Sequence, residues 1–362
     1  ARFHATYWSA KLRWLAAAQP DIFARVAQWI SFGEYVHRQF LGRSVCGLSM
    51  ASATGLLRTR QQQWDEELLR VLQVRPEQLP ALGDIRDGIQ GLAPRYAGRW
   101  PALRDAIWFP ALGDGATANV GSGCVSADTW ALTIGTSSAM RVVVPCGDVV
   151  PPDGLWLYLV DAKRAVLGGA LSEGGNMLAW LANTLKLSGL DAIDSLVADL
   201  RPGDHGLTIL PFISGERSLG WHSEARMTIS GLSLHTDPAM LLRAGLESLA
   251  YQILALYERL LQGLRLQHAP KVIGSGGTLL NSATLKQIIA DALGVAIYPS
   301  RAHEASARGA ALLALEALDL IDDVASVPPP LEQPTQPNHE NMAAYRQAAQ
   351  RQRDLYHLLL GS

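Results

Sequence analysis

The sequence predicts an α/β protein with a mixed sheet, divided into two domains. Short apolar runs of strand length alternate with longer segments in which apolar residues recur at helical spacing. Turns rich in glycine separate many of these segments. The chain has 362 residues, which is enough for two separate hydrophobic cores.

The beginning of the chain is predicted to be mostly helical. Apolar residues recur at helical spacing from Tyr7 to Leu41, with breaks at Gln19-Pro20 and at Ser31-Phe32-Gly33, which predicts three consecutive helices. A further amphipathic helix is expected at 64–74. Little regular structure is expected in the Pro- and Gly-rich stretch 76–101.

The sequence changes character after this stretch. A short apolar strand is expected at 106–112, followed by the turn Gly113-Asp114-Gly115 and a helix. Two apolar runs joined by a glycine turn at 135–138 then predict a β-hairpin. We therefore divide the chain into domains over residues 1–125 and 126–362.

Strands and helices alternate through the second domain. Strands are expected at 130–134, 140–144, 165–167, 207–211, 271–273 and 295–298. Helices are expected at 177–185, 238–264, 282–293 and 305–318. A Pro-rich connector and a polar helix close the chain.

The composition excludes several classes of function. The formal net charge is −2 and no run of five or six like charges occurs, so neither nucleic acid nor a membrane surface is an expected partner. The three cysteines lack the spacing of a zinc site or a disulfide framework, and no His/Cys/Asp cluster has metal-ligand spacing. The most apolar stretch, 310–320, is interrupted by Glu316 and Asp319, so no transmembrane helix is expected. We expect a cytoplasmic protein with reduced thiols.

Four glycine-rich turns are candidates for phosphate binding. Each lies between a strand and another element, where backbone N–H groups can converge on an anion. Each is weak evidence by itself, and the turn at 274–279 lacks the sixth-position Gly or Ala of the dinucleotide fingerprint. No Walker-type phosphate loop, H-E-x-x-H or G-x-S-x-G pattern occurs.

Taken in series, these motifs resemble those of the FGGY family of carbohydrate kinases, and the resemblance extends over essentially the whole chain. The matching segments occur in the family's order: Tyr7 to Leu15, Leu112 to Ala116, Leu132 to Ser137, Gly174-Gly175-Asn176 with Trp180, Leu210-Pro211-Phe212, Gly215-Glu216-Arg217, and Gly276-Gly277 with Asn281. The resemblance implies two ribonuclease-H-like domains of the actin, hexokinase and Hsp70 type. The first would bind mainly the sugar and the second mainly ATP.

The resemblance implies that Asp114 is the general base and also contacts the sugar. Phosphoryl transfer from ATP needs an in-line hydroxyl, Mg²⁺ and other groups that neutralise charge, and a base for the hydroxyl proton. The pattern alone leaves another interpretation open, since Asp between a turn and a helix is typical of a helix N-cap. The two roles are compatible.

The resemblance also implies a nucleotide site. Backbone N–H groups and hydroxyls of Gly135, Thr136 and Ser137 would meet the ATP phosphates, because glycine lets the chain approach a ligand closely. The nucleoside would be flanked by Gly175, Gly276 and Gly277, and the adenine edge would meet Asn281. The alternatives are an ordinary hairpin turn at the first segment and a strand-to-helix turn, capped by Asn281 or Ser282, at the last.

Other residues have weaker assignments. Tyr7 and Trp8 are candidates for sugar contact, although aromatic residues that open an amphipathic helix more often pack in a core. Arg217 is interpreted as a structural ion-pair partner. Gly115 and Leu219 depart from residues that are frequent in the family at these positions, and Gly115 offers no side chain to hold a sugar hydroxyl.

The favoured acceptor is gluconate or a related open-chain sugar acid, because segments 135–141 and 174–176 look closest to gluconokinases. Xylulose or another pentulose is the alternative, and glycerol is less favoured. An actin-like or Hsp70-like nucleotide-binding scaffold without sugar turnover is a competing hypothesis of another class. A homodimer is left open.

The first phosphate loop of the family, an Asp-x-Gly-Thr hairpin that normally lies far ahead of the segment at Tyr7 and Trp8, has no equivalent in the sequence, and the first residue is not Met. We therefore expect an N-terminal segment to be missing and the first domain to be incomplete. We also expect the chain as given not to transfer phosphate at an appreciable rate.

Overall fold

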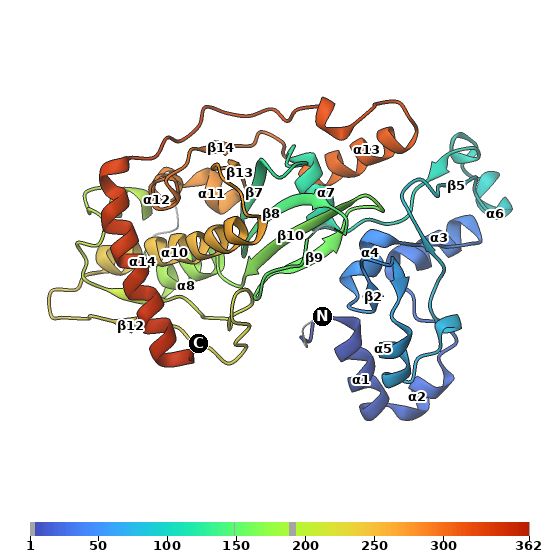
Figure 1. Ribbon diagram of the computed structural model, residues 1–362, viewed down its shortest axis with the longest axis horizontal. Coiled ribbons are helices and arrows are strands. Elements are labelled where there is room, and N and C mark those ends of the chain that lie inside the picture. Colours follow the sequence, from blue (N-terminus) through green and yellow to red (C-terminus); the bar gives the residue numbers. More distant parts are fainter. Residues whose placement is uncertain (1–3, 148, 188–192, 362) are drawn as a thin grey trace.

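The computed structural model describes residues 4–147, 149–187 and 193–361, and its larger part is built on a six-stranded sheet (Figure 1). The strands are β7 (Thr129–Ile134), β8 (Ser138–Pro145), β9 (Trp156–Leu159), β10 (Arg164–Leu171), β13 (Lys271–Ser275) and β14 (Ile297–Pro299). Their order is β14-β13-β7-β8-β10-β9. Strands β7, β8, β10 and β9 pair antiparallel, whereas β13 runs parallel to both β7 and β14. The sheet is therefore mixed, as predicted.

Helices cover both faces of this sheet (Figure 1). Helices α8 (Gly175–Thr184), α10 (Pro238–Leu264) and α12 (Ala283–Leu293) cover one face, and α7 (Asp114–Gly121) and α13 (Ala305–Ala317) cover the other. Alternation along β8 divides its side chains between these two cores, because successive residues of a strand face opposite sides. Val142 packs with α10, and Val143 packs with α7.

Helix α10 is the central helix of the larger core. Among the described residues it is the one helix whose length and apolar composition would allow it to cross a membrane. However, 78% of its most apolar window is buried inside the protein. Core packing accounts for its apolar character.

The beginning of the chain forms the smaller part in Figure 1, made of short helices and two-residue strands. Its helices are α1 (Trp8–Ala18), α2 (Pro20–Arg25), α3 (Phe32–Leu41), α4 (Leu48–Ala53), α5 (Glu66–Val71) and α6 (Pro94–Ala97), with 3₁₀ turns at Pro76–Gln78 and Pro101–Leu103. Its strands are β1 (Cys46–Gly47), β2 (Leu57–Arg58), β3 (Gln63–Trp64), β4 (Leu82–Gly83), β5 (Ile89–Gln90) and β6 (Ile107–Trp108). It joins the sheet where the hydroxyl of Ser52 accepts a hydrogen bond from the N–H of Leu159 at 2.8 Å.

The remaining elements connect and enclose the larger part. They are α9 (Ile193–Val197), β11 (Thr208–Leu210), β12 (Thr228–Ser230), α11 (Gly277–Asn281), a 3₁₀ turn at Val324–Ser326 and the closing helix α14 (His339–Leu360). The three consecutive helices near the beginning of the chain, the β-hairpin and helix α10 confirm the predictions for those segments. Sequence reasoning missed several short elements, among them α4, α9, α11, β9, β12 and the two-residue strands β1 to β5.

Helices α7 and α13 touch backbone to backbone at two glycines. A Cβ atom added to Gly121 would lie 1.8 Å from the carbonyl oxygen of Ala305, and one added to Gly309 would lie 1.8 Å from that of Thr117. Neither position has room for any side chain. This contact fixes α7, whose first residue is Asp114, against the sheet.

We expect Gly121→Ala to lower the free energy of unfolding by about 2–4 kcal/mol, because the added methyl group overlaps backbone that cannot move aside locally. Urea denaturation monitored by circular dichroism measures this change. Gly98→Ala is the matched control: a Cβ atom there meets no atom within 4 Å, so its stability should stay within about 0.5 kcal/mol of wild type. Equal stability of the two variants would contradict the proposed packing constraint.

Candidate active site

Three glycine-rich turns that are far apart in the sequence meet at the turn between β7 and β8. The carbonyl oxygen of Gly135 accepts hydrogen bonds from the N–H of Gly175 at 2.7 Å and from the hydroxyl of Thr278 at 3.0 Å. The N–H of Asn176 donates to the carbonyl oxygen of Thr136 at 3.1 Å. The structure thus brings together the candidate phosphate turn and both candidate nucleoside turns.

The candidate phosphate turn presents two residues to solvent. Thr136 and Ser137 are exposed, and within the described part of the chain neither donates a backbone hydrogen bond. The N–H of Gly135, by contrast, donates to the carbonyl oxygen of Ser137 at 3.0 Å. The turn itself therefore uses the N–H of Gly135, whereas the N–H groups of Thr136 and Ser137 stay available for the predicted phosphate contact.

At the other two turns, contacts within the protein explain why positions 175 and 276 are glycine. Gly276 has a φ of +92°, and a Cβ atom there would lie 2.4 Å from the carbonyl oxygen of Ile134. A Cβ atom on Gly175 would lie 2.4 Å from the hydroxyl oxygen of Thr278. Glycine is therefore required at 276 by the backbone of Ile134 and the positive φ, and at 175 by the side chain of Thr278 and the carbonyl oxygen of Gly135. Gly277 faces open space, since the nearest atom to an added Cβ is 4.0 Å away, on Asn281.

A cavity of about 230 Å³ opens beside these turns. It is lined by the predicted residues Gly175, Gly277 and Asn281 and by Leu178, Ile193, Asp194, Leu246, Thr278 and Ser282. Sequence reasoning missed Asp194, which belongs to no motif, and assigned no role to Thr278, although it lies within the turn 274–279. The carboxylate of Asp194 accepts hydrogen bonds from the N–H groups of Ala283 and Thr284, which begin α12.

Asp114 lies at the beginning of α7, on the opposite side of the sheet from α10. It is the first residue of the helix, and Gly113 occupies the N-cap position. The alternative interpretation of Asp114 as the N-cap is therefore wrong by one residue. The Asp114 carboxylate is exposed and accepts a hydrogen bond from the N–H of Gly115 at 2.6 Å. Its second oxygen stays available to a ligand.

Arg141 on β8 lies beside this carboxylate. In the sheet register Arg141 pairs with Gly168 of β10, and Gly168 pairs with Trp156 of β9. Burial lowers the pKa of Arg141, the charge of Arg217 lowers it further, and the charge of Asp114 opposes both effects. Arg141 and Asp114 are thus close enough to interact electrostatically, although no ion pair forms between them.

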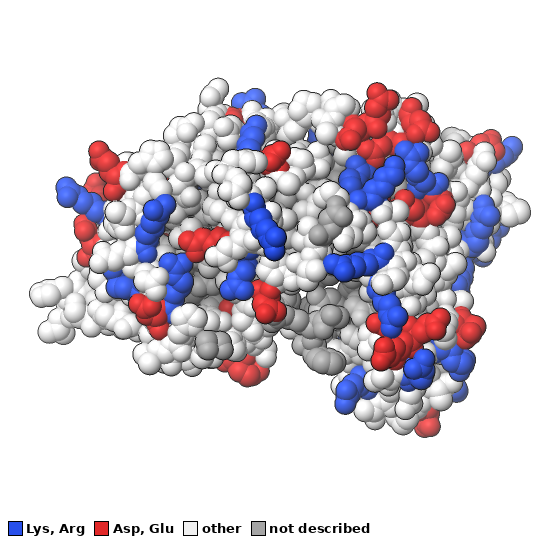
Figure 2. All heavy atoms as spheres, in the orientation of Figure 1, with Lys and Arg blue, Asp and Glu red and all other residues white. Residues whose placement is uncertain are grey.

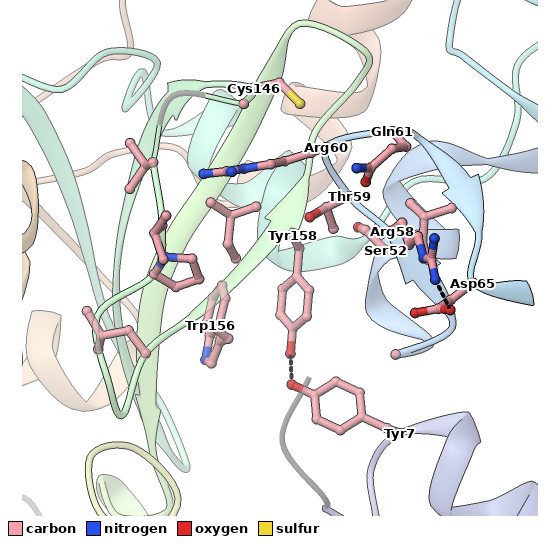
Figure 3. Close-up of a pocket in the computed structure, with 18 of the residues that line it drawn as sticks. Tyr7, Ser52, Arg58, Thr59, Arg60, Gln61, Asp65, Cys146, Trp156 and Tyr158 are labelled. Atoms are coloured by element: carbon pink, nitrogen blue, oxygen red, sulfur yellow. Dashed lines mark hydrogen bonds and ion pairs between the residues drawn. The ribbon is translucent and has the colours of Figure 1, made fainter. Parts of the chain in front are cut away.

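A larger cavity of about 490 Å³ lies between the beginning of the chain and the β9 edge of the sheet (Figure 3). Tyr7 is 7% exposed and lines this cavity, where its hydroxyl lies 3.0 Å from that of Tyr158. The ring of Tyr158 stacks on Trp156, with ring centroids 4.5 Å apart. Figure 3 shows Arg60 extending across the cavity from the smaller part. Trp8 packs into a separate cluster with Leu12, so the structure separates the two aromatic candidates.

Arg217 does not have the structural ion pair that was expected of it. None of the described acidic side chains pairs with Arg217, and its Nε atom is buried without a hydrogen-bond partner. The next residue, Ser218, is bound firmly: its N–H donates to the carbonyl oxygen of Ala170, and its hydroxyl accepts from the N–H of Ala170, both at 3.0 Å. The expectation failed because the glutamate beside Arg217, Glu216, bonds Tyr356 instead.

A doubly covered mixed sheet with glycine turns around a cavity, opposite an exposed aspartate, defines an α/β protein with the fold of the actin and hexokinase type. Residues 2–121 match the model of the FGGY family of carbohydrate kinases, N-terminal domain, and residues 124–318 match that of the C-terminal domain. The chain belongs to the FGGY family of carbohydrate kinases.

Individual relatives include both favoured kinds of sugar kinase. The chain is 26% identical to a gluconokinase of Bacillus subtilis over 88% of its own length, and it spans 64% of the length of that relative. It is 27% identical to a xylulose kinase of Escherichia coli over 98% of its length and spans 73% of that protein. A gluconate kinase structure and a ligand-bound xylulose kinase structure, both from Lactobacillus acidophilus, each superpose with a TM-score of 0.92, covering 99% of this chain and 73% of the other, at 24% and 25% identity.

Glu173 is a buried acid beside the candidate phosphate turn. It is 2% exposed, and its carbonyl oxygen accepts a hydrogen bond from the hydroxyl of Ser138. Burial raises the pKa of Glu173 to about 7, and the nearby charge of Glu216 raises it as well, against a hydrogen bond from the N–H of Ser214. The acid therefore changes its charge near neutral pH.

We expect Glu173→Gln to remove a pH dependence of stability. The folded-state pKa of about 7 lies above the ordinary value of 4.5, so the stabilisation is fully present below about pH 4.5 and is lost as the pH rises through about 7. The free energy of unfolding of the wild type should therefore fall between about pH 5 and pH 8 relative to that of the variant. Urea denaturation at several pH values measures this difference. Glu77→Gln, at an exposed position, should follow the wild type; parallel curves for wild type and Glu173→Gln would contradict the assignment.

We expect Gly277→Val to weaken adenine nucleotide binding at least about tenfold, because the branched side chain enters the 230 Å³ cavity without meeting the protein. Isothermal titration with ADP measures the affinity, and thermal unfolding should show a Tm close to that of the wild type. Gly276→Ala is the contrasting variant: it should lower the Tm, because its Cβ overlaps Ile134. Unchanged ADP affinity of Gly277→Val would remove this cavity from the nucleotide site.

Proposed function

We propose that this protein transfers the γ-phosphoryl group of ATP to a hydroxyl group of a sugar or sugar acid. The observation that carries the proposal is the placement of Asp114 next to Arg141, three residues along β8 from the end of the candidate phosphate turn at Ser138. Three residues of extended strand span about 10 Å. A carboxylate and a phosphate-binding turn at this separation fit an acceptor hydroxyl that lies between them.

The residues have separate roles in this proposal. The exposed carboxylate of Asp114, oriented by the N–H of Gly115, accepts the proton of the acceptor hydroxyl as the bond to phosphorus forms. The N–H groups and hydroxyls of Thr136 and Ser137 bind phosphate oxygens. The adenosine occupies the cavity at Gly277 and Asn281, which has open space for it. Asp114 and Tyr7 are the proposed sugar contacts.

We further propose that Mg²⁺ enters with the nucleotide. Across the described ranges, no group of three or more His, Cys, Asp or Glu side chains is arranged to hold a metal ion. In kinases Mg²⁺ is carried largely by phosphate oxygens and water, with one or two carboxylates. Mg²⁺ would neutralise charge on the transferred group, and the donors at the phosphate turn would act beside it.

The division of labour proposed for the chain places sugar binding in residues 1–125 and nucleotide binding in residues 126–362. The boundaries of the two family matches, at 121 and 124, support this division. We place the protein in the cytoplasm, where its three free cysteines would stay reduced. Figure 2 supports small-molecule partners, because Lys and Arg are interspersed with Asp and Glu over the face shown. A homodimer stays open.

The relatives favour two acceptor substrates, gluconate and xylulose, since they include both gluconokinases and xylulose kinases. The competing proposal, a nucleotide-binding scaffold, predicts ADP formation that no sugar stimulates. An ADP-release assay on the full-length gene product, with a panel of sugar acids, ketoses and polyols, separates these functions. Stimulation by a sugar or sugar acid supports the kinase, and sugar-independent turnover supports the scaffold.

In the full-length product, we expect Asp114→Asn to lower kcat by about 10²–10⁴-fold while acceptor and nucleotide affinities change only a few-fold, because the amide keeps the shape but cannot accept the proton. Steady-state kinetics and titration calorimetry measure the two effects. Asp105→Asn, in the loop ahead of the strand β6, is the control with the same chemical change and should behave as wild type. Near-normal turnover of Asp114→Asn would exclude Asp114 as the base.

A further inference from the structure

Two arginine side chains each have a buried nitrogen with unused hydrogen-bonding capacity. The Nε atoms of Arg141 and Arg217 are both buried, and no described residue accepts a hydrogen bond from either. Among the buried polar side-chain atoms without a partner in the described ranges, these two belong to permanent cations. A buried N–H group without an acceptor is costly, so an anion that accepts hydrogen bonds from these two arginines would stabilise the site.

The two arginines reach the same place from different elements. Arg141 extends over Gly168, where an added Cβ atom would lie 3.1 Å from the Cγ of Arg141. Arg217 comes from the loop that Ser218 ties to Ala170, the second residue after Gly168 on β10. These contacts bring both arginines to the same stretch of β10, and the charge of Arg217 lowers the pKa of Arg141. The charge of Asp114 opposes this effect, but no hydrogen bond joins Asp114 to Arg141.

Gly115 leaves the guanidinium of Arg141 accessible. A Cβ atom added to Gly115 would lie 3.5 Å from the Nε of Arg141, in van der Waals contact with it. The absence of a side chain at this position therefore opens space on the side of Arg141 that faces the beginning of α7. This space adjoins Asp114, the proposed base.

We propose that Arg141 and Arg217 bind the carboxylate of the acceptor, so that the substrate is an open-chain sugar acid and not a neutral sugar or polyol. The proposal rests on the proposed function. Arginine matches a carboxylate because its planar fork donates two parallel hydrogen bonds. When the two arginines hold the carboxylate, the hydroxylated chain of the substrate extends from them toward Asp114.

The transferred phosphoryl group is the other anion that could meet these arginines. The position of Arg217 favours the acceptor. The loop that carries Arg217 lies beside the 490 Å³ cavity at β9, because Trp221 lines that cavity and its indole N–H donates to the carbonyl oxygen of Gly154. The charge of Arg217 acts to lower the pKa values of His4 and of Tyr158 on β9. Neither arginine forms a hydrogen bond with the candidate phosphate turn at Gly135 to Ser137. Arg141 and Arg217 are therefore assigned to the sugar-binding part of the proposed site.

Substitution of either arginine should leave the fold intact. No described residue loses a hydrogen bond from Nε when Arg141 or Arg217 becomes Met, and a methionine keeps much of the apolar stem. Arg353→Met is the matched control, because Arg353 lies on α14 and pairs with Glu258 at the surface of the larger part. Arg141→Lys keeps the charge and loses the fork.

The test compares two ligands that differ at one end only: D-gluconate and D-glucitol, in which the carboxylate is replaced by a hydroxymethyl group. Binding to the full-length product is measured by titration calorimetry, with ADP as a third ligand. The wild type should bind gluconate at least about 30-fold more tightly than glucitol. Arg141→Met and Arg217→Met should lose about 30- to 10³-fold in gluconate affinity, with glucitol and ADP within about threefold of wild type. Arg141→Lys should fall between, and Arg353→Met should match the wild type.

Four outcomes overturn the proposal. Equal wild-type affinity for gluconate and glucitol means that no carboxylate is recognised. A loss of ADP affinity in the arginine variants with gluconate affinity unchanged assigns the pair to the phosphoryl group. If no acceptor stimulates ADP formation by the wild type, the proposed function fails as well. ADP formation stimulated by neutral acceptors only would instead contradict the carboxylate site and leave the kinase function standing.

Discussion

The carbonyl oxygen of Gly135 is the hydrogen-bond acceptor that holds together the three turns at the proposed nucleotide site. It takes one hydrogen bond from the N–H of Gly175 and another from the hydroxyl of Thr278, and a carbonyl oxygen has two lone pairs to offer. These two bonds join the beginnings of α8 and α11 to the hairpin turn. Loss of the bond from Gly175 would leave a half-buried N–H group without its partner, and loss of the bond from Thr278 would remove the link between α11 and the hairpin turn.

The elements with strong local signals were predictable from the sequence, whereas those defined by tertiary contact were not. Helix α10 could be predicted with its observed limits because helical periodicity continues from Pro238 to Leu264 without a break. Strand β9 could not, since four apolar residues without alternation are compatible with a helix or a strand. Pairing with β10 decides its structure.

The same distinction applies to the candidate site. The glycine turns and Asp114 could be found because they lie in ordered motifs. The second cation could not: Arg217 looked like an ion-pair partner of a neighbouring acid, yet Glu216 is held by Tyr356 and by the N–H of Gly220. Only the folded chain shows that Glu216 is already occupied and that Arg217 lies near Arg141. Sequence spacing carries no information about which of two competing partners a carboxylate will take.

Strand β8 couples the two halves of the proposed chemistry. Its first residue, Ser138, follows the phosphate turn, and its side chain bonds the backbone of Glu173 on the α10 side. Arg141, at an odd number of residues further on, necessarily faces the α7 side, where Asp114 begins its helix. A register shift of one residue would send Arg141 to the opposite face and into the apolar core around α10. Strand β8 therefore sets the separation between the candidate phosphate turn and Arg141. Helix α7, which packs on α13 at two glycines, holds the proposed base Asp114 beside Arg141. Phosphoryl transfer depends on alignment and on the placement of charge. This arrangement fixes both, because Arg141 lies on a strand and Asp114 on a helix.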